Sequence, residues 1–130
     1  MNANEEKISE RVIGCAFAVS NGLGTGFLES VYENALAAEM HDKRLPFEQQ
    51  KPIDVFYREQ PAGHFVADFA VDCRLIVEIK AISQLTSKHE AQLMNYLRAT
   101  GFSAGLLLNF GTSKLGITRR VRGHDDRAAF

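Results

Sequence analysis

The sequence contains no tryptophan, only two cysteines and three prolines, and almost no net charge. Cys15 and Cys73 lie far apart and form no CxxC pair, so neither a zinc site nor a disulfide framework is expected. No hydrophobic run approaches the roughly 20 residues of a membrane-spanning helix. The N-terminus is acidic and polar and lacks the basic and apolar regions of a secretory signal. We therefore expect a cytoplasmic protein that does not enter a membrane.

The size and composition of the chain are those of one folded domain. Of its 130 residues, 45% are hydrophobic and 24% are charged, which is close to the average for globular proteins. We predict a single domain over residues 1–130, with an ordered core at about residues 5–122 and a short C-terminal tail. Acidic residues dominate residues 1–50 and basic residues dominate residues 111–130. The small net charge therefore does not exclude nucleic acid as a ligand.

Hydrophobic periodicity predicts three helices. Apolar residues spaced three and four apart mark one face of a helix at residues 5–20. A glycine-rich break follows, and a second helical pattern ends before Pro46. Ser87 and Glu90 resemble a capping box that opens a third helix, and Gly101 is a suitable residue to end it.

Five segments have the composition of strands. Pro61 and Gly63 are turn signals between the first two strands, which precede a third at residues 75–80. A continuously apolar run at residues 106–110 predicts a strand covered on both faces, and an alternating segment near residue 120 predicts an edge strand. The order is therefore α-α-β-β-β-α-β-β. We predict an α/β (α+β) fold with a mixed sheet flanked by helices.

A charged pair in the third strand is the most informative feature of the sequence. Glu78 and Lys80 alternate with apolar residues, so both side chains point to one face of the sheet. A three-residue turn at residues 72–74 would place Asp68 opposite Glu78, whereas a two-residue turn would place it opposite Val77. Both turns are compatible with the sequence, as is a bulge. The apolar pattern favours the first, because Phe65, Ala67 and Phe69 would then line one face together with the apolar residues of the third strand.

Two carboxylates and a lysine on one sheet face have a clear chemical use. Carboxylate oxygens bind Mg²⁺ or Mn²⁺, and such ions hold phosphates and lower the pKa of a bound water. A lysine beside the ion can orient that water and stabilise the charge of a phosphoryl transition state. The alternative is a buried salt-bridge network of Asp68, Glu78 and Lys80 with a purely structural role.

Two helices carry further candidates. Glu29 lies on the flank of the apolar stripe of the second helix and can face inward; alternatively it stabilises the helix N-terminus through the helix dipole. In the third helix, His89, Gln92 and Tyr96 stack on one face. A glutamine can hold a nucleophilic water or a phosphate oxygen, and a tyrosine can contact a sugar or base. The alternative is an exposed polar helix face.

These residues together resemble a known family. Asp68 followed by Glu78-Ile79-Lys80 is similar to the core of the PD-(D/E)xK nuclease superfamily, and the segment from Gln92 to Tyr96 resembles its QxxxY helix motif. The segment from Gly26 to Tyr32 resembles the pattern of the GxxExxY proteins, a bacterial and archaeal family of that superfamily. The likeness extends from about residue 8 to residue 121. Ala67 stands where the superfamily has the proline of its PD motif.

The resemblance implies a restriction-endonuclease-like fold and a role for each matching residue. Asp68 and Glu78 would be metal ligands, with the carbonyl of Ile79 as a further ligand, and Glu29 would be the helix carboxylate that joins the site. Lys80 would be the catalytic lysine. Gln92 and Tyr96 would form the QxxxY helix.

The resulting prediction is an enzyme, a Mg²⁺- or Mn²⁺-dependent nuclease that hydrolyses phosphodiester bonds of DNA or RNA. Tyr96, His89, Arg119 and Arg120 are the candidate contacts to nucleic acid, although the two arginines also suit a solvated edge strand. The alternative is a non-catalytic nucleic-acid-binding or assembly module that keeps the fold. Nucleases of this size often act as homodimers or with a partner protein, and the sequence leaves the oligomeric state open between these arrangements and a monomer.

Overall fold

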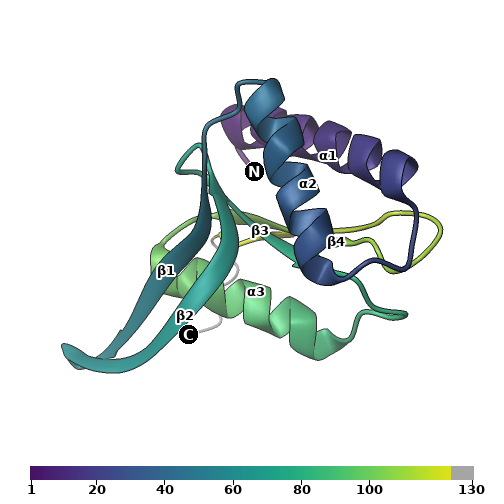
Figure 1. Cartoon of the computed structure of the whole chain (residues 1–130). Helices are drawn as coiled ribbons and strands as arrows, with labels where there is room; N and C mark the ends of the chain where they lie inside the picture. Colours follow the sequence, from purple (N-terminus) through teal and green to yellow (C-terminus); the bar gives the residue numbers. More distant parts are fainter. Residues whose placement is uncertain (124–130) are drawn as a thin grey trace.

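The computed structural model describes residues 1–123; the predicted C-terminal tail falls mostly on residues 124–130, which lie outside the described part. Helices α1 and α2 cover one face of a five-stranded sheet and α3 covers the other (Figure 1). The observed element order and the mixed sheet confirm the predicted fold class. The elements, in chain order, are α1 (Ala3–Leu23), α2 (Glu29–Asp42), β1 (Phe47–Tyr57), β2 (Gln60–Val71), β3 (Leu75–Lys80), α3 (Ser87–Thr100), β4 (Ala104–Asn109) and β5 (Gly116–Val121).

The sheet has the strand order β1-β2-β3-β4-β5. All neighbouring strands are antiparallel except β3 and β4, which run parallel. A parallel pair needs a crossover connection, and α3 supplies it. Strands β3 and β4 are buried on both faces, and among their residues only Lys80 is partly exposed. This confirms the prediction of a strand covered on both faces at residues 106–109, where β4 ends.

Two apolar clusters hold the three layers together. The larger lies between the sheet and helices α1 and α2, and it includes Val12, Tyr32 and Phe69. The smaller lies between the sheet and α3, and it includes Ile76 and Leu97. Each helix therefore buries its apolar stripe against the sheet, as the helical periodicity predicts.

The β1–β2 hairpin is longer than the sequence pattern predicts. Its turn is formed by Arg58 and Glu59, whose φ angles are 49° and 67°. Positive φ at both central residues is typical of the type I′ turn, whose twist matches that of a hairpin. Pro61 and Gly63 therefore lie inside β2, and their prediction as the turn was wrong. Pro61 is tolerated there because the pairing shifts register between Val55 and Phe56, which is a bulge.

The start of α3 also differs from the prediction. Thr86 is the N-cap, and its box partner is His89, whose Nδ1 accepts from the Thr86 backbone N–H at 3.0 Å. The box therefore begins one residue before Ser87. Gly101 ends the helix in a left-handed conformation with φ 78°, as predicted.

The register between β2 and β3 follows the predicted three-residue turn, with Val71 opposite Leu75 and Phe69 opposite Val77. The apolar residues of β2 do not all lie on one face, however. Phe69 packs toward α1 and α2, whereas Ala67 packs toward α3 and Phe65 is partly exposed beside that helix. The predicted common face for these residues was wrong because the alternation of β2 breaks between Ala67 and Phe69.

Two other expectations can be compared with the described residues. Cys15 is buried and Cys73 is exposed, and neither forms a disulfide. Within residues 1–123, no helix combines the length and the hydrophobicity that crossing a membrane requires.

Candidate active site

Asp68 occupies the point where the alternation of β2 breaks. The backbone ladder between β2 and β3 ends at Phe69 and Val77, and side chains continue the pairing beyond it. Glu78 Oε2 accepts from the Asp68 backbone N–H at 2.6 Å, and Asp68 Oδ2 accepts from the Ile79 backbone N–H at 2.7 Å. Each carboxylate is thus fixed by the strand that carries the other, and the two acidic groups are brought together.

The electrostatic environment raises the pKa of both carboxyl groups. Burial is the main cause for Glu78, which is only 5% exposed, and the nearby charge of Asp68 adds to it. Together these effects raise the pKa of Glu78 to about 8. Burial also raises the pKa of Asp68, to about 6, although its hydrogen bond from Ile79 acts in the opposite direction. The pair therefore holds negative charge at a cost that a cation would relieve.

Lys80 lies two residues after Glu78, at the end of β3, and is half-buried. Its positive charge lowers the pKa of both carboxyl groups and so offsets part of the rise. Within residues 1–123, however, Lys80 takes part in none of the salt bridges, which join other residues. The described structure therefore does not show the salt-bridge network considered above for Asp68, Glu78 and Lys80.

The backbone after Lys80 is held by Asn109, a residue that the sequence reasoning did not single out. Asn109 is buried opposite Lys80 in the sheet. Its side chain accepts from the backbone N–H groups of Ile82 and Gly111 and donates to the carbonyl of Ile82 at 3.0 Å. A buried polar residue at the end of the apolar run Leu106–Leu108 was the signal that could have identified it.

A second carboxylate from α2 was also missed. Glu33 accepts two hydrogen bonds from Gln50 Nε2, at 2.9 and 3.0 Å, and the same nitrogen lies 3.5 Å from Asp68 Oδ1. Gln50 adopts φ 56°, an unusual conformation for a non-glycine residue, and it lies in β1 beside the break in β2. Glu33 and Gln50 therefore connect α2 to Asp68.

Glu29 begins α2 and is exposed. It acts on Asp68 through its charge, which raises the Asp68 pKa less than the charge of Glu33 does. Glu29 is therefore near enough for its charge to act on Asp68, but within residues 1–123 no hydrogen bond joins the two side chains. Among residues 1–123, no three His, Cys, Asp or Glu side chains converge closely enough to form a metal-binding group.

Tyr32 lies in α2 between Glu29 and Glu33, and it has a structural role. Its hydroxyl donates to the Gly24 carbonyl at 2.6 Å and accepts from the Phe27 N–H at 3.2 Å, and its ring stacks on Phe110. Gly26 has φ 105°, a conformation that favours glycine. Gly26 and Tyr32 therefore fix the loop that leads into α2, and with it the start of the helix.

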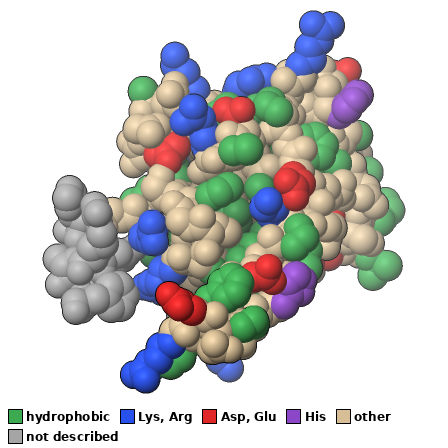
Figure 2. Space-filling view, turned by 90° about the vertical axis from the view of Figure 1, so that its left-hand side faces the viewer, with side chains coloured by type: hydrophobic (Ala, Val, Ile, Leu, Met, Phe, Trp, Pro, Cys, Tyr) green, Lys and Arg blue, Asp and Glu red, His purple; other side chains and the backbone are tan. Residues whose placement is uncertain are grey.

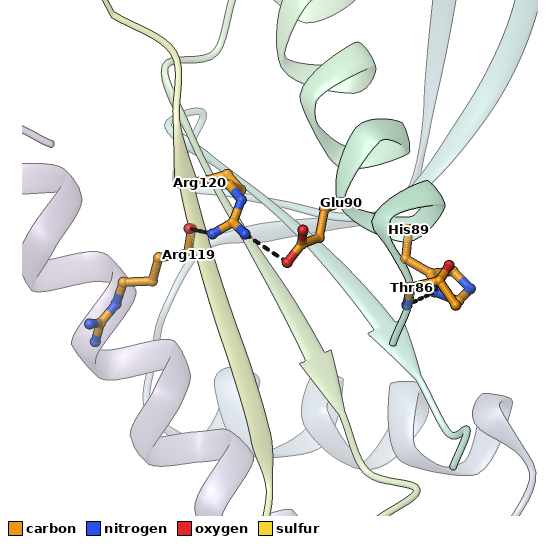
Figure 3. A network of polar contacts seen from close by, with 5 residues as sticks. All are labelled: Thr86, His89, Glu90, Arg119 and Arg120. Carbon is orange, nitrogen blue, oxygen red and sulfur yellow. Dashed lines mark hydrogen bonds and ion pairs between the residues drawn. The ribbon is translucent and has the colours of Figure 1, made fainter. Parts of the chain in front are cut away.

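Helix α3 brings Tyr96 to the carboxylate pair and leaves Gln92 exposed one turn earlier. Burial raises the pKa of the Tyr96 hydroxyl, and the charges of Glu78 and Asp68 raise it further. His89 caps the same helix at its N-terminus, so one ring nitrogen is occupied by Thr86 (Figure 3). Of these three residues, Tyr96 is the one that lies close enough to the carboxylate pair to feel its charge.

The two arginines of β5 project to opposite sides of that strand (Figure 3). The Arg120 guanidinium donates to Glu90 Oε1 at 2.6 Å and to the Arg119 carbonyl at 2.7 Å. Arg119 is exposed. On the face shown in Figure 2, Lys and Arg side chains project from several places, interspersed with Asp and Glu, and do not form one continuous basic patch.

Comparison with known proteins gives a consistent family and fold. The family described as the PD-(D/E)XK nuclease superfamily matches residues 6–121. Among solved structures, the crystal structure of SSO0001 is similar with a TM-score of 0.60 and 14% identity, covering 77% of this chain and 53% of that one. An alkaline exonuclease from Laribacter hongkongensis is similar with a TM-score of 0.55 and 14% identity, covering 77% and 59%.

At this identity, the two structures show a shared fold alone. The present chain spans between half and three-fifths of their lengths. None of the curated proteins matches the sequence significantly.

Proposed function

Because this chain belongs to the PD-(D/E)XK nuclease superfamily, we propose that it is a metal-dependent nuclease that hydrolyses phosphodiester bonds of DNA or RNA. The observation that carries the proposal is the reciprocal pair of Asp68 and Glu78 on adjacent strands, with Lys80 two residues further along β3. Such a pair is costly to keep charged without a cation. An arrangement of this kind is therefore better explained by ligand binding than by stability.

The donor set fits Mg²⁺ or Mn²⁺. Both ions prefer oxygen ligands, and Asp68, Glu78 and the carbonyl of Ile79 supply them from neighbouring positions. Glu29 is the fourth ligand in this proposal, and it would reach the site from the start of α2. When bound, the ion supplies Lewis-acid polarisation of the phosphodiester group. The raised pKa values support the fit, since a divalent cation offsets the two crowded negative charges.

The remaining residues orient the reactants in this proposal. Lys80 orients the attacking water and stabilises negative charge on the phosphoryl group, and Gln92 steadies the water from α3. Tyr96 and His89 contact the substrate on the same helix. Glu33, through Gln50, holds Asp68 in position and is a positioning residue. Arg119 contributes a phosphate contact from β5. Arg120 contributes another through the guanidinium N–H groups that do not donate to Glu90 or to the Arg119 carbonyl.

We further propose that the chain belongs to the GxxExxY branch and carries the QxxxY helix. Two observations support this. Gly26 has a positive φ that favours glycine, and the buried Tyr32 hydroxyl bonds to the Gly24 carbonyl, so the fold requires both the glycine and the tyrosine of the motif. Glu29, the glutamate of the motif, is exposed and makes no contact of this kind, and in this proposal its presence is explained by a functional role.

The test is cleavage of labelled single- and double-stranded DNA and RNA with Mg²⁺, with Mn²⁺ and with EDTA. We expect cleavage only with a metal, and a loss of 100-fold or more in Lys80→Ala, because positioned general catalysis typically contributes about that much. Lys88→Ala is the matched control, since Lys88 is an exposed lysine on α3, and it should keep the wild-type rate.

Absence of cleavage with every metal, or equal cleavage by Lys80→Ala, would contradict the proposal. Binding of nucleic acid without cleavage would instead support the alternative of a non-catalytic binding or assembly module. Sedimentation of the protein alone would show whether it forms the homodimer that is common among nucleases of this size.

A further inference from the structure

The outer part of the β1–β2 hairpin extends beyond the rest of the sheet (Figure 1). A groove lies between this part and α3. It has a volume of about 530 Å³ and its walls include Phe56 and Phe65 from the hairpin and Asn95, Tyr96 and Arg98 from α3. Phe56 is 62% exposed and Phe65 is 43% exposed. Two exposed aromatic rings along one groove are unusual for a surface that has no ligand.

The groove leads to the carboxylate pair. The rings of Phe65 and Tyr96 are neighbours, with centroids 5.6 Å apart. Tyr96 in turn packs in the apolar cluster that contains Ala67 and Ile76, which lie next to Asp68 and two residues before Glu78. Phe65, on the groove wall with Phe56, therefore adjoins Tyr96, and Tyr96 packs on the strand residues that lie close in sequence to Asp68 and Glu78.

Basic groups accompany the aromatic rings. Arg98 lines the groove and donates to Asn95 Oδ1 at 3.1 Å, and Arg58 lies over the Tyr57 ring at the tip of the hairpin, 5.3 Å from its centroid. Asp54, the acidic residue of the lining, is 2.9 Å from His64 Nδ1. Arg98 is thus the basic residue of the groove lining, whereas Arg58 lies at the tip of the hairpin outside it. Aromatic rings beside an arginine suit a ligand that has flat faces and a negatively charged backbone.

We propose that this groove binds unpaired nucleotides of a single-stranded nucleic acid, with Phe56 and Phe65 stacking on the bases and leading the strand to the carboxylate pair. The inference rests on the proposed nuclease function and deepens it by naming the substrate class. Bases within a duplex already stack on their neighbours, so their faces are unavailable to side chains. Unpaired bases expose those faces, and stacking on them does not depend on sequence.

The absence of tryptophan from the chain provides a direct test. Phe56→Trp introduces a single tryptophan in the groove, and Phe17→Trp introduces one at another exposed position, on α1, as the control. In EDTA, an unlabelled oligothymidylate of about 12 nucleotides should quench Phe56→Trp fluorescence and leave Phe17→Trp unchanged. Quenching of both proteins, or of neither, would overturn the proposal.

Binding affinities provide a second measurement. In EDTA, a labelled single strand should bind the wild-type protein at least tenfold more tightly than a duplex of the same length. Phe56→Ala should raise the Kd for the single strand about tenfold, since one base–aromatic stack is worth about that factor. Phe17→Ala should leave it unchanged. Equal binding of duplex and single strand, or no effect of Phe56→Ala, would overturn the proposal.

These measurements are independent of cleavage, so the two proposals fail separately. Stacking without metal-dependent cleavage would overturn the nuclease and keep the groove assignment. Cleavage with unchanged single-strand affinity in Phe56→Ala would do the reverse. If Phe56→Ala instead converts a dimer to a monomer in sedimentation and leaves oligonucleotide affinity unchanged, the groove is an interface between two copies of the chain and the proposal is wrong.

Discussion

At the scale of single residues, Asp68 and Glu78 combine a structural role with a destabilising charge. Each accepts a short hydrogen bond from the backbone of the opposite strand, which continues the pairing of β2 with β3. Each also has a raised pKa, because burial and the other carboxylate disfavour its ionised form. The acceptor oxygens are needed by the fold, but the second negative charge is not.

This difference predicts the effect of Glu78→Gln on stability. A carboxyl group whose pKa is raised by folding binds its proton more tightly in the folded state, so the stability that it contributes at low pH is lost as the pH rises. For Glu78 the loss occurs between its ordinary value of 4.5 and about 8. The amide keeps an acceptor for Asp68 and cannot ionise. In EDTA, Glu78→Gln should therefore melt at least about 3 °C above wild type at pH 8.5.

At pH 5 the two proteins should melt within about a degree of each other, since Glu78 is then largely protonated in the folded state. The measurement is thermal unfolding followed by circular dichroism at both pH values. Glu59→Gln, which changes an exposed carboxylate in the hairpin turn, is the control and should not show this pH dependence. A Glu78→Gln protein that melts below wild type at pH 8.5 would contradict the electrostatic argument.

At the scale of elements, the position of Lys80 depends on the segment between β3 and α3. Asn109 holds this segment through three hydrogen bonds to Ile82 and Gly111. The chain packs so closely here that a Cβ atom on Gly111 would lie 2.2 Å from the Ile82 carbonyl oxygen. The end of β3 is therefore fixed by backbone-to-backbone packing as well as by the sheet.

Gly111→Ala should disrupt this segment strongly. The added methyl group overlaps backbone atoms that cannot move without breaking the Asn109 hydrogen bonds, so we expect a loss of at least about 3 kcal/mol in the free energy of unfolding. Gly14→Ala is the matched control: Gly14 lies on the exposed side of α1 with open space around it, and the change should stabilise the protein by up to about 1 kcal/mol. Urea unfolding of both variants measures the difference.

If the two variants had the same stability, the close packing at Gly111 would be wrong. If Gly111→Ala fails to fold altogether, Gly111→Ser in the same assay should fail too, while Gly14→Ser should fold.

The elements themselves follow largely from local patterns, whereas their ends and connections do not. Helical periodicity and alternating strands gave the order of all eight elements, because burial of one face leaves a regular pattern in sequence. The hairpin turn was misplaced because Arg58 and Glu59 adopt positive φ without the glycine or asparagine that usually signals it. The α3 capping box was misplaced by one residue because His89 is an uncommon partner for the N-cap.

The candidate site was predictable where its residues share a strand or a helix turn. The register that brings Asp68 to Glu78 was favoured by the apolar pattern, although Ala67 and Phe65 proved to lie elsewhere. Glu33, Gln50 and Asn109 were missed because each acts through a contact between elements that are distant in sequence. The period and spacing of a single sequence do not record such contacts, although the place of Asn109 at the end of an apolar run marked it as a buried polar residue.

At the scale of the whole molecule, the near-zero net charge conceals acidic residues held together at one end of the sheet. A divalent cation bound there would offset the charge of two carboxylates whose ionised forms burial disfavours, and would displace the proton that Glu78 otherwise keeps up to a pH of about 8. Cation binding, folding and proton release are therefore coupled in the proposed function.

This coupling predicts that Mn²⁺ stabilises the protein. A ligand present at about 100 times its Kd raises the free energy of unfolding by about 2.7 kcal/mol, which corresponds to a rise in Tm of several degrees. We expect this rise with Mn²⁺ and its reversal by EDTA, and a larger rise at pH 8 than at pH 5.5, because protons compete with the cation for the carboxylates. Differential scanning calorimetry provides the measurement.

Asp68→Asn should abolish most of the rise, and Asp54→Asn, which changes an exposed carboxylate of the hairpin, should keep it. An equal rise in Tm for Asp68→Asn, or none in the wild type, would show that the cation does not bind between Asp68 and Glu78.

The early end of the β2–β3 ladder has a mechanical consequence. Beyond Phe69 the hairpin is joined to β3 by the side-chain bonds of Asp68 and Glu78, while its outer part is paired only within itself. The hairpin is thus held to the rest of the molecule by the bonds of the two acidic residues and by the packing of Ile53, Ala67 and Phe65 against α3, so a force applied near Phe56 would act on both attachments.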